Sequence, residues 1–203
     1  MTHLYLIRHG AYDEKAPPPD QAEPLTAEGR RQSQRLRDAW GGAGLPRPDV
    51  LLASPARRAR ETAEILSVGW SLLVAVDPAL LDWQCDEAGE LRHEEFIARW
   101  EAVPAPRKPF FRWVAGGENW VEFSARVHTA LDRLVHDHAG GCVALVTHGW
   151  VIQAAFEYFF GFGDANRLRS GIVMQPTALT HWMWQEAGGK WLLERHNDCS
   201  HLA

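Results

Sequence analysis

The chain has 203 residues, of which 46% are hydrophobic and 23% are charged, and its formal net charge is -5 at pH 7. This length and composition predict a single globular domain, residues 1–203, with a sizeable apolar core. The net negative charge argues against nucleic acid and acidic membrane surfaces as partners, so any anion site must be built locally.

The three cysteines, Cys85, Cys142 and Cys199, are far apart and form no C-x-x-C pair. They predict neither a disulfide framework nor a cysteine zinc site, and a reducing cytoplasm fits them best. The N-terminus lacks a basic segment followed by an apolar stretch of signal length, and the sequence contains no run of about 18 apolar residues. We therefore expect a cytoplasmic protein with no membrane partner.

Strand-like and helix-like segments alternate along the first half of the chain. The apolar run 4–7 predicts a strand that stops at the turn Arg8-His9-Gly10. Thr26 is placed to cap a helix, because apolar residues follow it at helical spacing up to Trp40. Two further strands and a helix between them are predicted at residues 50–53, 72–76 and 59–66, respectively.

The second half begins with an irregular, proline-containing segment and then returns to the same alternation. We interpret residues 83–120 as a cap inserted over the sheet, with one helix at about residues 90–102. We predict a helix at 120–134, a strand at 142–146 and a second helix at 150–160. A final hairpin is predicted from two strands, 179–184 and 191–196. The pattern predicts a three-layer α/β/α sandwich with a mostly parallel sheet, which binds ligands beyond the carboxyl ends of its strands.

Three of the predicted strands end in residues suited to an anion. Arg8 and His9 follow the first strand, Ser54 and Arg58 follow the second, and His148 follows the strand at 142–146. Because the carboxyl ends of parallel strands share one edge of a sheet, we expect these side chains to meet. Guanidinium groups match phosphate oxygens, and a neutral imidazole can attack phosphorus, so this edge predicts a phosphate site with a histidine nucleophile. The flanking arginines favour the neutral form of His9 by lowering its pKa.

Several short motifs follow one another in a fixed order. They are Leu6-Ile7-Arg8-His9-Gly10, Pro24-Leu25-Thr26 with Gly29 and Gln32, Ser54-Pro55-Ala56-Arg57-Arg58-Ala59, Gly116-Gly117-Glu118-Asn119 and Val146-Thr147-His148-Gly149. In this order they resemble the histidine phosphatase superfamily, which includes cofactor-dependent phosphoglycerate mutases and many small phosphatases. The resemblance spans nearly the whole chain and implies a phosphoglycerate mutase-like fold.

The resemblance implies a catalytic role for five residues. His9 would be the nucleophile, Arg8 and Arg58 would hold the phosphoryl oxygens, and His148 would neutralise the same group. The family places a carboxylic general acid two residues after a leucine that follows the third strand, and Asp82 stands there with aspartate in place of glutamate. Asp82 would have to stay protonated at working pH, which burial beneath a cap would achieve.

Departures from the family pattern leave alternatives open. Tyr12 and Lys15 stand where the family has threonine and asparagine, and Lys15 can still contact a phosphate as a point charge. Asp86 and Glu87 are alternative candidates for the general acid. We expect Ser54 to help bind the phosphate, since the G-x-S-x-G turn of a serine nucleophile is absent.

The sequence predicts neither a metal nor a cofactor. It contains no Walker A motif and no dinucleotide glycine fingerprint, and its other histidines lack the spacing of metal ligands. The expected partner is a small phosphorylated substrate, whose selectivity we place in residues 83–120. The oligomeric state is left open, because apolar stripes that face a core and those that face another subunit look alike.

Three functions are compatible with these residues. The leading hypothesis is a phosphomonoester phosphatase that acts through a covalent phosphohistidine on His9, with Asp82 as the acid. The second is a phosphoglycerate mutase-type phosphotransferase, although the family's mutases generally carry longer insertions around the pocket. The third is a catalytically silent module that binds a phosphorylated ligand, and the retained histidines and arginines count against it.

Overall fold

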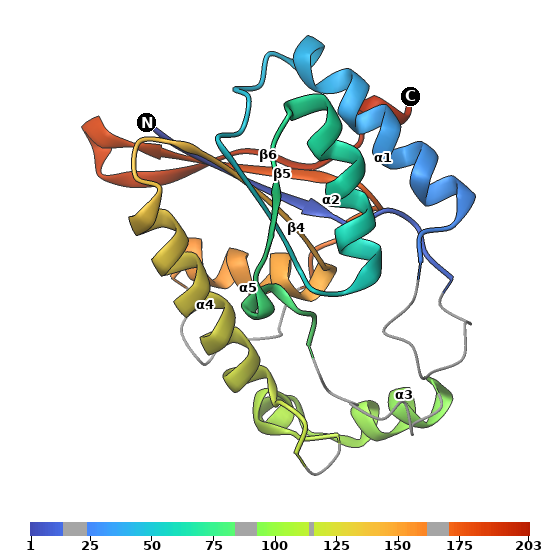
Figure 1. Cartoon of the computed structure of the whole chain (residues 1–203). Helices are drawn as coiled ribbons and strands as arrows, with labels where there is room; N and C mark the ends of the chain where they lie inside the picture. Colours follow the sequence, from blue (N-terminus) through green and yellow to red (C-terminus); the bar gives the residue numbers. More distant parts are fainter. Residues whose placement is uncertain (14–23, 84–92, 114–115, 162–170) are drawn as a thin grey trace.

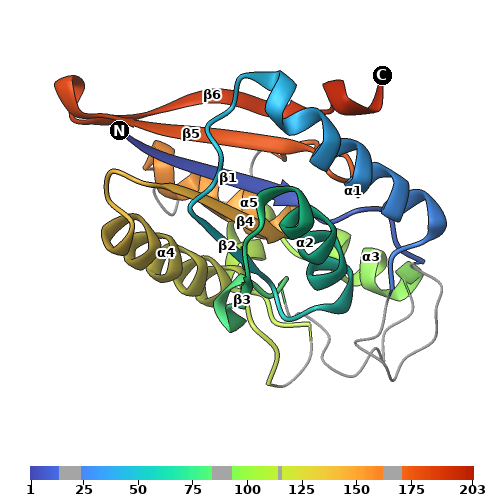
Figure 2. The same cartoon turned by 45° about the horizontal axis from the view of Figure 1, so that its top comes forward.

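The computed structural model describes residues 1–13, 24–83, 93–113, 116–161 and 171–203. Within them a six-stranded sheet lies between two layers of helices (Figures 1 and 2). The strands are β1 (Thr2–Arg8), β2 (Val50–Ala53), β3 (Val74–Val76), β4 (Cys142–Thr147), β5 (Leu179–Gln185) and β6 (Lys190–Asp198). The α-helices are α1 (Ala27–Ala39), α2 (Arg57–Trp70), α3 (His93–Ala102), α4 (Trp120–Asp137) and α5 (Gly149–Phe160). Short 3-10 helices are η1 (Trp40–Ala43), η2 (Pro78–Leu80), η3 (Ala105–Phe110), η5 (Glu186–Gly188) and η6 (Ser200–Leu202).

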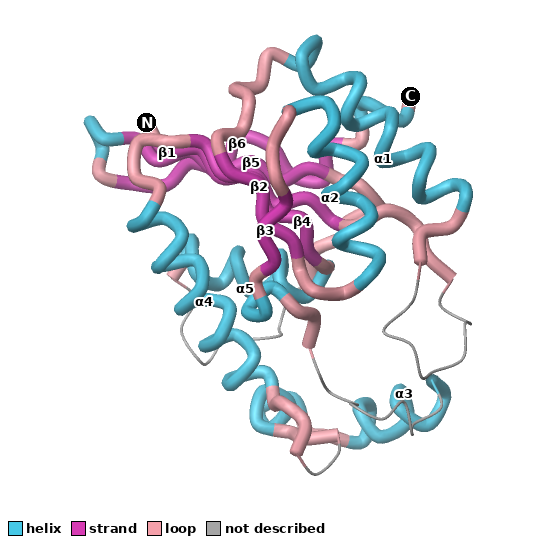
Figure 3. The backbone as a smooth tube through the Cα atoms, in the orientation of Figure 1, coloured by secondary structure: helices cyan, strands magenta, loops and turns pink. Residues whose placement is uncertain are grey.

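The strand order in the sheet is β3-β2-β4-β1-β5-β6 (Figure 2), and Figure 3 shows these strands in magenta between the helices. The four strands β3, β2, β4 and β1 are parallel to one another, whereas β5 is antiparallel to β1 and β6 is antiparallel to β5. The predicted α/β/α sandwich with a mostly parallel sheet is therefore confirmed. None of the described helices has both the length and the apolar character of a transmembrane segment.

Alternation along β1 directs side chains into two separate cores. Leu4 and Leu6 pack in the core that contains the apolar faces of α4 and α5, whereas Tyr5 and Ile7 pack in the core that contains those of α1 and α2. All four side chains are almost completely inaccessible to solvent. A strand that is buried on both faces needs an uninterrupted apolar run, which explains the Leu-Tyr-Leu-Ile sequence.

The observed element boundaries differ slightly from the predicted ones. Strand β3 begins at Val74 and not at Leu72, because the Leu72 N–H donates a hydrogen bond of 3.3 Å to the Ser67 carbonyl and so closes α2. The intervening residue Ser71 has a left-handed backbone with φ of 51°, which is typical of a helix end. The predicted cap, residues 83–120, includes α3 and η3, and α3 stands apart from the sheet (Figure 1).

The start of α1 lies directly against the loop that follows β1. A Cβ atom on Gly29 would stand 2.0 Å from the Ala11 carbonyl oxygen, and one on Gly10 would stand 2.6 Å from the Gly29 carbonyl oxygen. The Thr26 hydroxyl accepts a hydrogen bond of 3.1 Å from the Gly29 N–H and donates one of 3.1 Å to the Ala11 carbonyl. The position of the residues next to His9 thus depends on a close backbone contact with α1.

We expect Gly29→Ala to lower the free energy of unfolding by about 1 to 3 kcal/mol, because its methyl group must displace the Ala11 backbone. Urea unfolding followed by circular dichroism measures this change. Gly41→Ala is the matched control, since a Cβ atom there would have no neighbour within 4 Å. Equal stability of the two variants would contradict the close contact.

Candidate active site

The candidate residues meet where β1, β2 and β4 end. In the sheet register Arg8 lies opposite Thr147, and Ala53 lies opposite Val146. The His9 N–H donates to the Thr147 carbonyl at 2.9 Å, and the Ser54 N–H donates to the Val146 carbonyl at 2.9 Å. The residues that follow the three strands are therefore neighbours in space, as the sequence predicts.

Arg58 connects the two histidines of the site. It is the second residue of α2, and its Nε lies 3.2 Å from His9 Nε2 while its Nη2 lies 3.2 Å from His148 Nδ1. The two imidazole centroids are 5.1 Å apart. Tyr12 packs beside them, with its ring centroid 4.6 Å from the Arg58 guanidinium carbon and 5.1 Å from the His9 ring. One cation thus contacts three aromatic side chains.

The contacts of His9 define where its proton lies. His9 Nδ1 is 2.8 Å from the Gly10 carbonyl oxygen, which can only accept, so Nδ1 carries the proton. His9 Nε2 accepts from the Arg58 Nε–H and is therefore unprotonated. Burial, followed by the Arg58 charge, lowers the pKa of His9 to about 3. The imidazole is consequently neutral near neutral pH, with its lone pair on Nε2.

His148 is held in the opposite tautomer. Its Nδ1 accepts from Arg58, so the proton lies on Nε2, which donates to the Ser54 hydroxyl oxygen at 2.7 Å. That hydroxyl oxygen also accepts a hydrogen bond of 3.3 Å from the Ala56 N–H. Burial and then the Arg58 charge lower the pKa of His148 well below its ordinary value, so this ring is also neutral. Ser54 thereby fixes the orientation of the second imidazole.

Asp82 faces the same two groups. Its Oδ2 lies 3.7 Å from His148 Nδ1 and 4.0 Å from Arg58 Nη2. Its Oδ1 is buried and has no hydrogen-bond partner among the described residues. Removal from water raises the pKa of Asp82 to about 6, against the opposing effect of the nearby arginine charges. The carboxyl group therefore keeps its proton up to about pH 6.

A cavity of about 470 Å³ opens beside these groups. Arg8, His9 and Asp82 line it together with Tyr12, Gly149, Trp150, Gln153, Gly171, Ile172, Val173 and Met174. The Arg8 guanidinium donates to the Met174 carbonyl, and its buried Nε has no partner within the described part of the chain. Polar groups suited to a phosphate thus share one cavity with apolar side chains such as Trp150, Ile172 and Met174.

The structure brings Arg8, His9, Arg58, Asp82 and His148 together at one site. Ser54 contacts this site through His148. The other predicted candidates, Lys15, Asp86 and Glu87, lie outside the described residues. No group of three or more metal-ligating side chains occurs among the residues that the structure describes.

Part of the cavity wall was not identified from the sequence. Trp150, which is 45% exposed, and residues 171–174 line it, whereas no described residue of 83–120 does. Trp150 could have been identified from the sequence, because it follows His148-Gly149 in the first turn of the helix that starts at the same strand end. Residues 171–174 carry no motif, and only the folded chain brings them to Arg8.

We expect His9 to remain neutral, with its proton on Nδ1, from about pH 5 to about pH 8, because its pKa of about 3 lies below that range. Nitrogen-15 NMR of labelled histidine measures this, since protonated and unprotonated ring nitrogens resonate at different shifts. His9→Gln assigns the signal by its disappearance. A His9 signal that titrates near pH 6.5, the ordinary histidine value, would contradict the lowered pKa, and a proton on Nε2 of the neutral ring would rule out the tautomer described above.

Comparison with known proteins places this geometry in a family. The model of the histidine phosphatase superfamily (branch 1) matches residues 4–199. A probable phosphoglycerate mutase of Klebsiella pneumoniae is 27% identical, over 100% of this chain and 95% of its own length. Among solved structures, Bacillus stearothermophilus YhfR is 26% identical with a TM-score of 0.78 over 100% of both chains. A mycobacterial glucosyl-3-phosphoglycerate phosphatase in complex with inorganic phosphate is 25% identical with a TM-score of 0.77 over 99% of both chains. With a match that covers nearly all of its length, the chain belongs to the histidine phosphatase superfamily.

Proposed function

We propose that the protein is a phosphomonoester phosphatase that forms a covalent phosphohistidine on His9. The observation that carries this proposal is the unprotonated Nε2 of a neutral imidazole beside the guanidinium group of Arg58. The solved mycobacterial relative holds inorganic phosphate, which fits a small phosphorylated substrate in the cavity. We further propose that residues 1–203 act as one domain and that residues 83–120 form its cap.

In the first half-reaction the Nε2 lone pair of His9 attacks phosphorus, and the ester P–O bond breaks. The Arg8 and Arg58 guanidinium groups balance the charge on the other phosphoryl oxygens. The negative charge of a bound phosphate raises the pKa of His148, so that this imidazole can take up a proton from solvent on Nδ1, in place of the hydrogen bond from Arg58, and neutralise the same group. Asp82 gives its proton to the departing oxygen, which keeps the electron pair of the broken bond.

In the second half-reaction water attacks the phosphorus of the phosphohistidine. The Asp82 carboxylate removes a proton from that water, and the N–P bond breaks with its electron pair returning to His9 Nε2. Phosphate leaves, and Asp82 is again protonated for the next cycle. The sum of the two steps converts ester and water into alcohol and phosphate, without a metal ion or a cofactor.

A phosphoglycerate mutase-type activity is a second candidate. Curated relatives from Cronobacter sakazakii and Klebsiella pneumoniae, both named as probable phosphoglycerate mutases, are 26% and 27% identical to this chain. A mutase forms the same phosphohistidine but returns the phosphoryl group to a second hydroxyl of the substrate. Measuring phosphate release and isomerisation in parallel, on a panel that includes 3-phosphoglycerate and phosphoserine, separates the two activities.

We expect His9→Ala to lower phosphate release by about 10⁴-fold or more, because the nucleophile is lost. The wild-type protein should take up label from phosphorus-32 substrate in a form that survives alkali and is lost in acid, as a phosphohistidine is. The His9→Ala variant should take up none. Undiminished release by that variant would exclude the phosphohistidine pathway.

We expect kcat/KM to fall as the pH rises above about 6, because Asp82 with a pKa of about 6 then loses the proton that the leaving group needs. The direction follows from the raised pKa: the acid form is present below that pH and absent above it. Since the substrate's own ionisation near pH 6 affects all variants alike, the pH profile is compared with that of Asp82→Asn. A descending limb that persists unchanged in Asp82→Asn would assign the acid elsewhere.

A further inference from the structure

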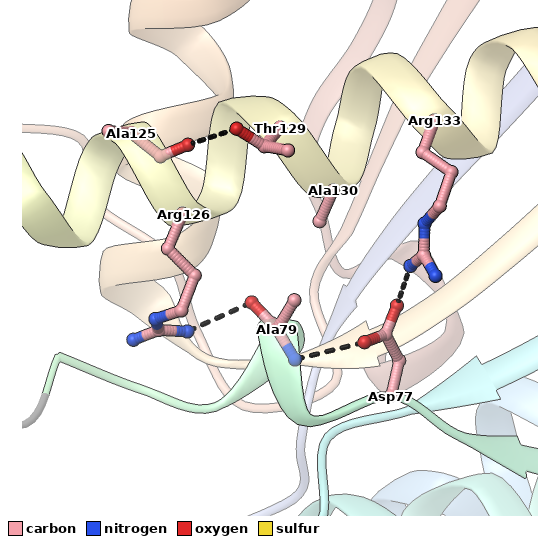
Figure 4. A pocket seen from close by; sticks show the side chains of 7 residues that line it. All are labelled: Asp77, Ala79, Ala125, Arg126, Thr129, Ala130 and Arg133. Atoms are coloured by element: carbon pink, nitrogen blue, oxygen red, sulfur yellow. Dashed lines mark hydrogen bonds and ion pairs between the residues drawn. The ribbon is translucent and has the colours of Figure 1, made fainter.

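Arg126 on α4 contacts the backbone of the segment that ends at Asp82. Its Nη1 donates to the carbonyl oxygens of Ala79 and Leu81 at 2.9 and 3.0 Å. Its Nη2 donates to the Asp82 carbonyl oxygen at 3.4 Å. Figure 4 shows the Arg126 side chain reaching from α4 to Ala79. A single guanidinium group therefore spans the chain from η2 to the proposed acid.

Glu118 fixes the orientation of this guanidinium group. The Arg126 Nε and Nη2 each lie 2.7 Å from a carboxylate oxygen of Glu118, which is the bidentate geometry that arginine favours. The Glu118 carbonyl oxygen in turn accepts a hydrogen bond of 3.0 Å from the Trp83 indole N–H. Asp82 is thus connected to Glu118 from both sides, through Arg126 and through the next residue, Trp83.

The remaining carbonyl of the segment is held from the sheet. The Thr147 hydroxyl, at the end of β4 and next to His148, donates to the Leu80 carbonyl at 2.8 Å. Every carbonyl from residue 79 to residue 82 therefore accepts a hydrogen bond from a side chain, and three of these bonds come from Arg126. Because Leu81 and Asp82 lie outside any strand or helix, side chains take the place of a backbone ladder here.

We propose that Arg126, paired with Glu118, is a positioning residue that holds the Asp82 carboxyl group against His148 and Arg58. The proposal rests on the proposed function, in which Asp82 is the general acid. Proton transfer requires the acid to stay within hydrogen-bond reach of the departing oxygen, so a small displacement of its backbone slows the step that needs the proton.

Arg126 also affects the charge balance around the acid. Among the described residues, the charged and titratable groups that face Asp82 are Arg8 from β1, Arg58 from α2, His148 from the end of β4 and Arg126 from α4. The Arg126 charge is one of those that lower the pKa of Asp82. Removal of this charge should therefore move the descending limb of the pH profile to higher pH. Lysine at this position would keep the charge but lose the bidentate hydrogen bonds to Glu118.

The test compares two leaving groups and reports kcat/KM, which does not include hydrolysis of the phosphohistidine. Phenol, with a pKa of about 10, needs a proton to leave, whereas dinitrophenolate does not. The variants are Arg126→Gln, Arg126→Lys and Asp82→Asn. The matched control is Arg133→Gln, because Arg133 lies on the same helix and pairs with Asp77 just before the segment (Figure 4).

For Arg126→Gln we expect kcat/KM to fall about tenfold or more on phenyl phosphate and to change less than about threefold on dinitrophenyl phosphate. Asp82→Asn should show the same selectivity more strongly. On phenyl phosphate, the kcat/KM of Arg126→Lys should lie between those of the wild type and Arg126→Gln. The descending limb of its pH profile should stay where it is in the wild type. Arg133→Gln should leave the ratio of the two substrates unchanged.

A loss of equal size on both substrates in Arg126→Gln, or no loss, would overturn the positioning role. If that variant does not fold, the substrate ratio of Arg126→Lys decides, and a wild-type ratio overturns the proposal. An Asp82→Asn variant without leaving-group selectivity would overturn the assignment of Asp82 as the acid and the positioning role with it. Selectivity in Asp82→Asn alone would leave the proposed function intact and reject only the role of Arg126.

Discussion

The site depends on one partly buried cation, the guanidinium group of Arg58, placed between two imidazoles. Because guanidinium can only donate, His9 Nε2 and His148 Nδ1 must both accept, and each ring must carry its proton on the other nitrogen. Those protons need buried acceptors, which the Gly10 carbonyl and the Ser54 hydroxyl supply. The same cation helps to lower the pKa of both histidines. The ends of β1, β2 and β4 therefore have to meet within hydrogen-bonding distance of α2.

The site residues that come directly after strands could be predicted from the sequence. The apolar runs 4–7, 50–53 and 142–146 mark strands buried on both faces, and the predicted parallel topology places the residues after them on one edge. This topology alone predicts that His9 and His148 lie close together. Arg58 was within reach of the same argument, because it lies in the first turn of a helix that follows such a strand.

The rest depends on contacts that leave no local signal. Arg126 occupies a polar position on an amphipathic helix, and its bond to the Leu81 carbonyl joins residues 45 positions apart. Nothing near either residue in sequence indicates that contact. The cavity wall at Ile172 and Met174 is similar, since it depends on where the chain passes before β5. The tautomers of the two imidazoles likewise required distances, because residue type alone allows either nitrogen to carry the proton.

The opposing influences on Asp82 suit the two tasks that the proposed cycle gives it. A carboxyl group that first donates a proton and then accepts one works best when its pKa is close to the working pH. Burial alone would raise the pKa further and make the carboxyl group a weaker proton donor to the departing oxygen. The charges of Arg58, Arg8 and Arg126 alone would lower it until no proton remained to donate. A backbone fixed to α4 keeps the carboxyl at one depth and one distance from these charges, so geometry and acidity are set by the same contacts.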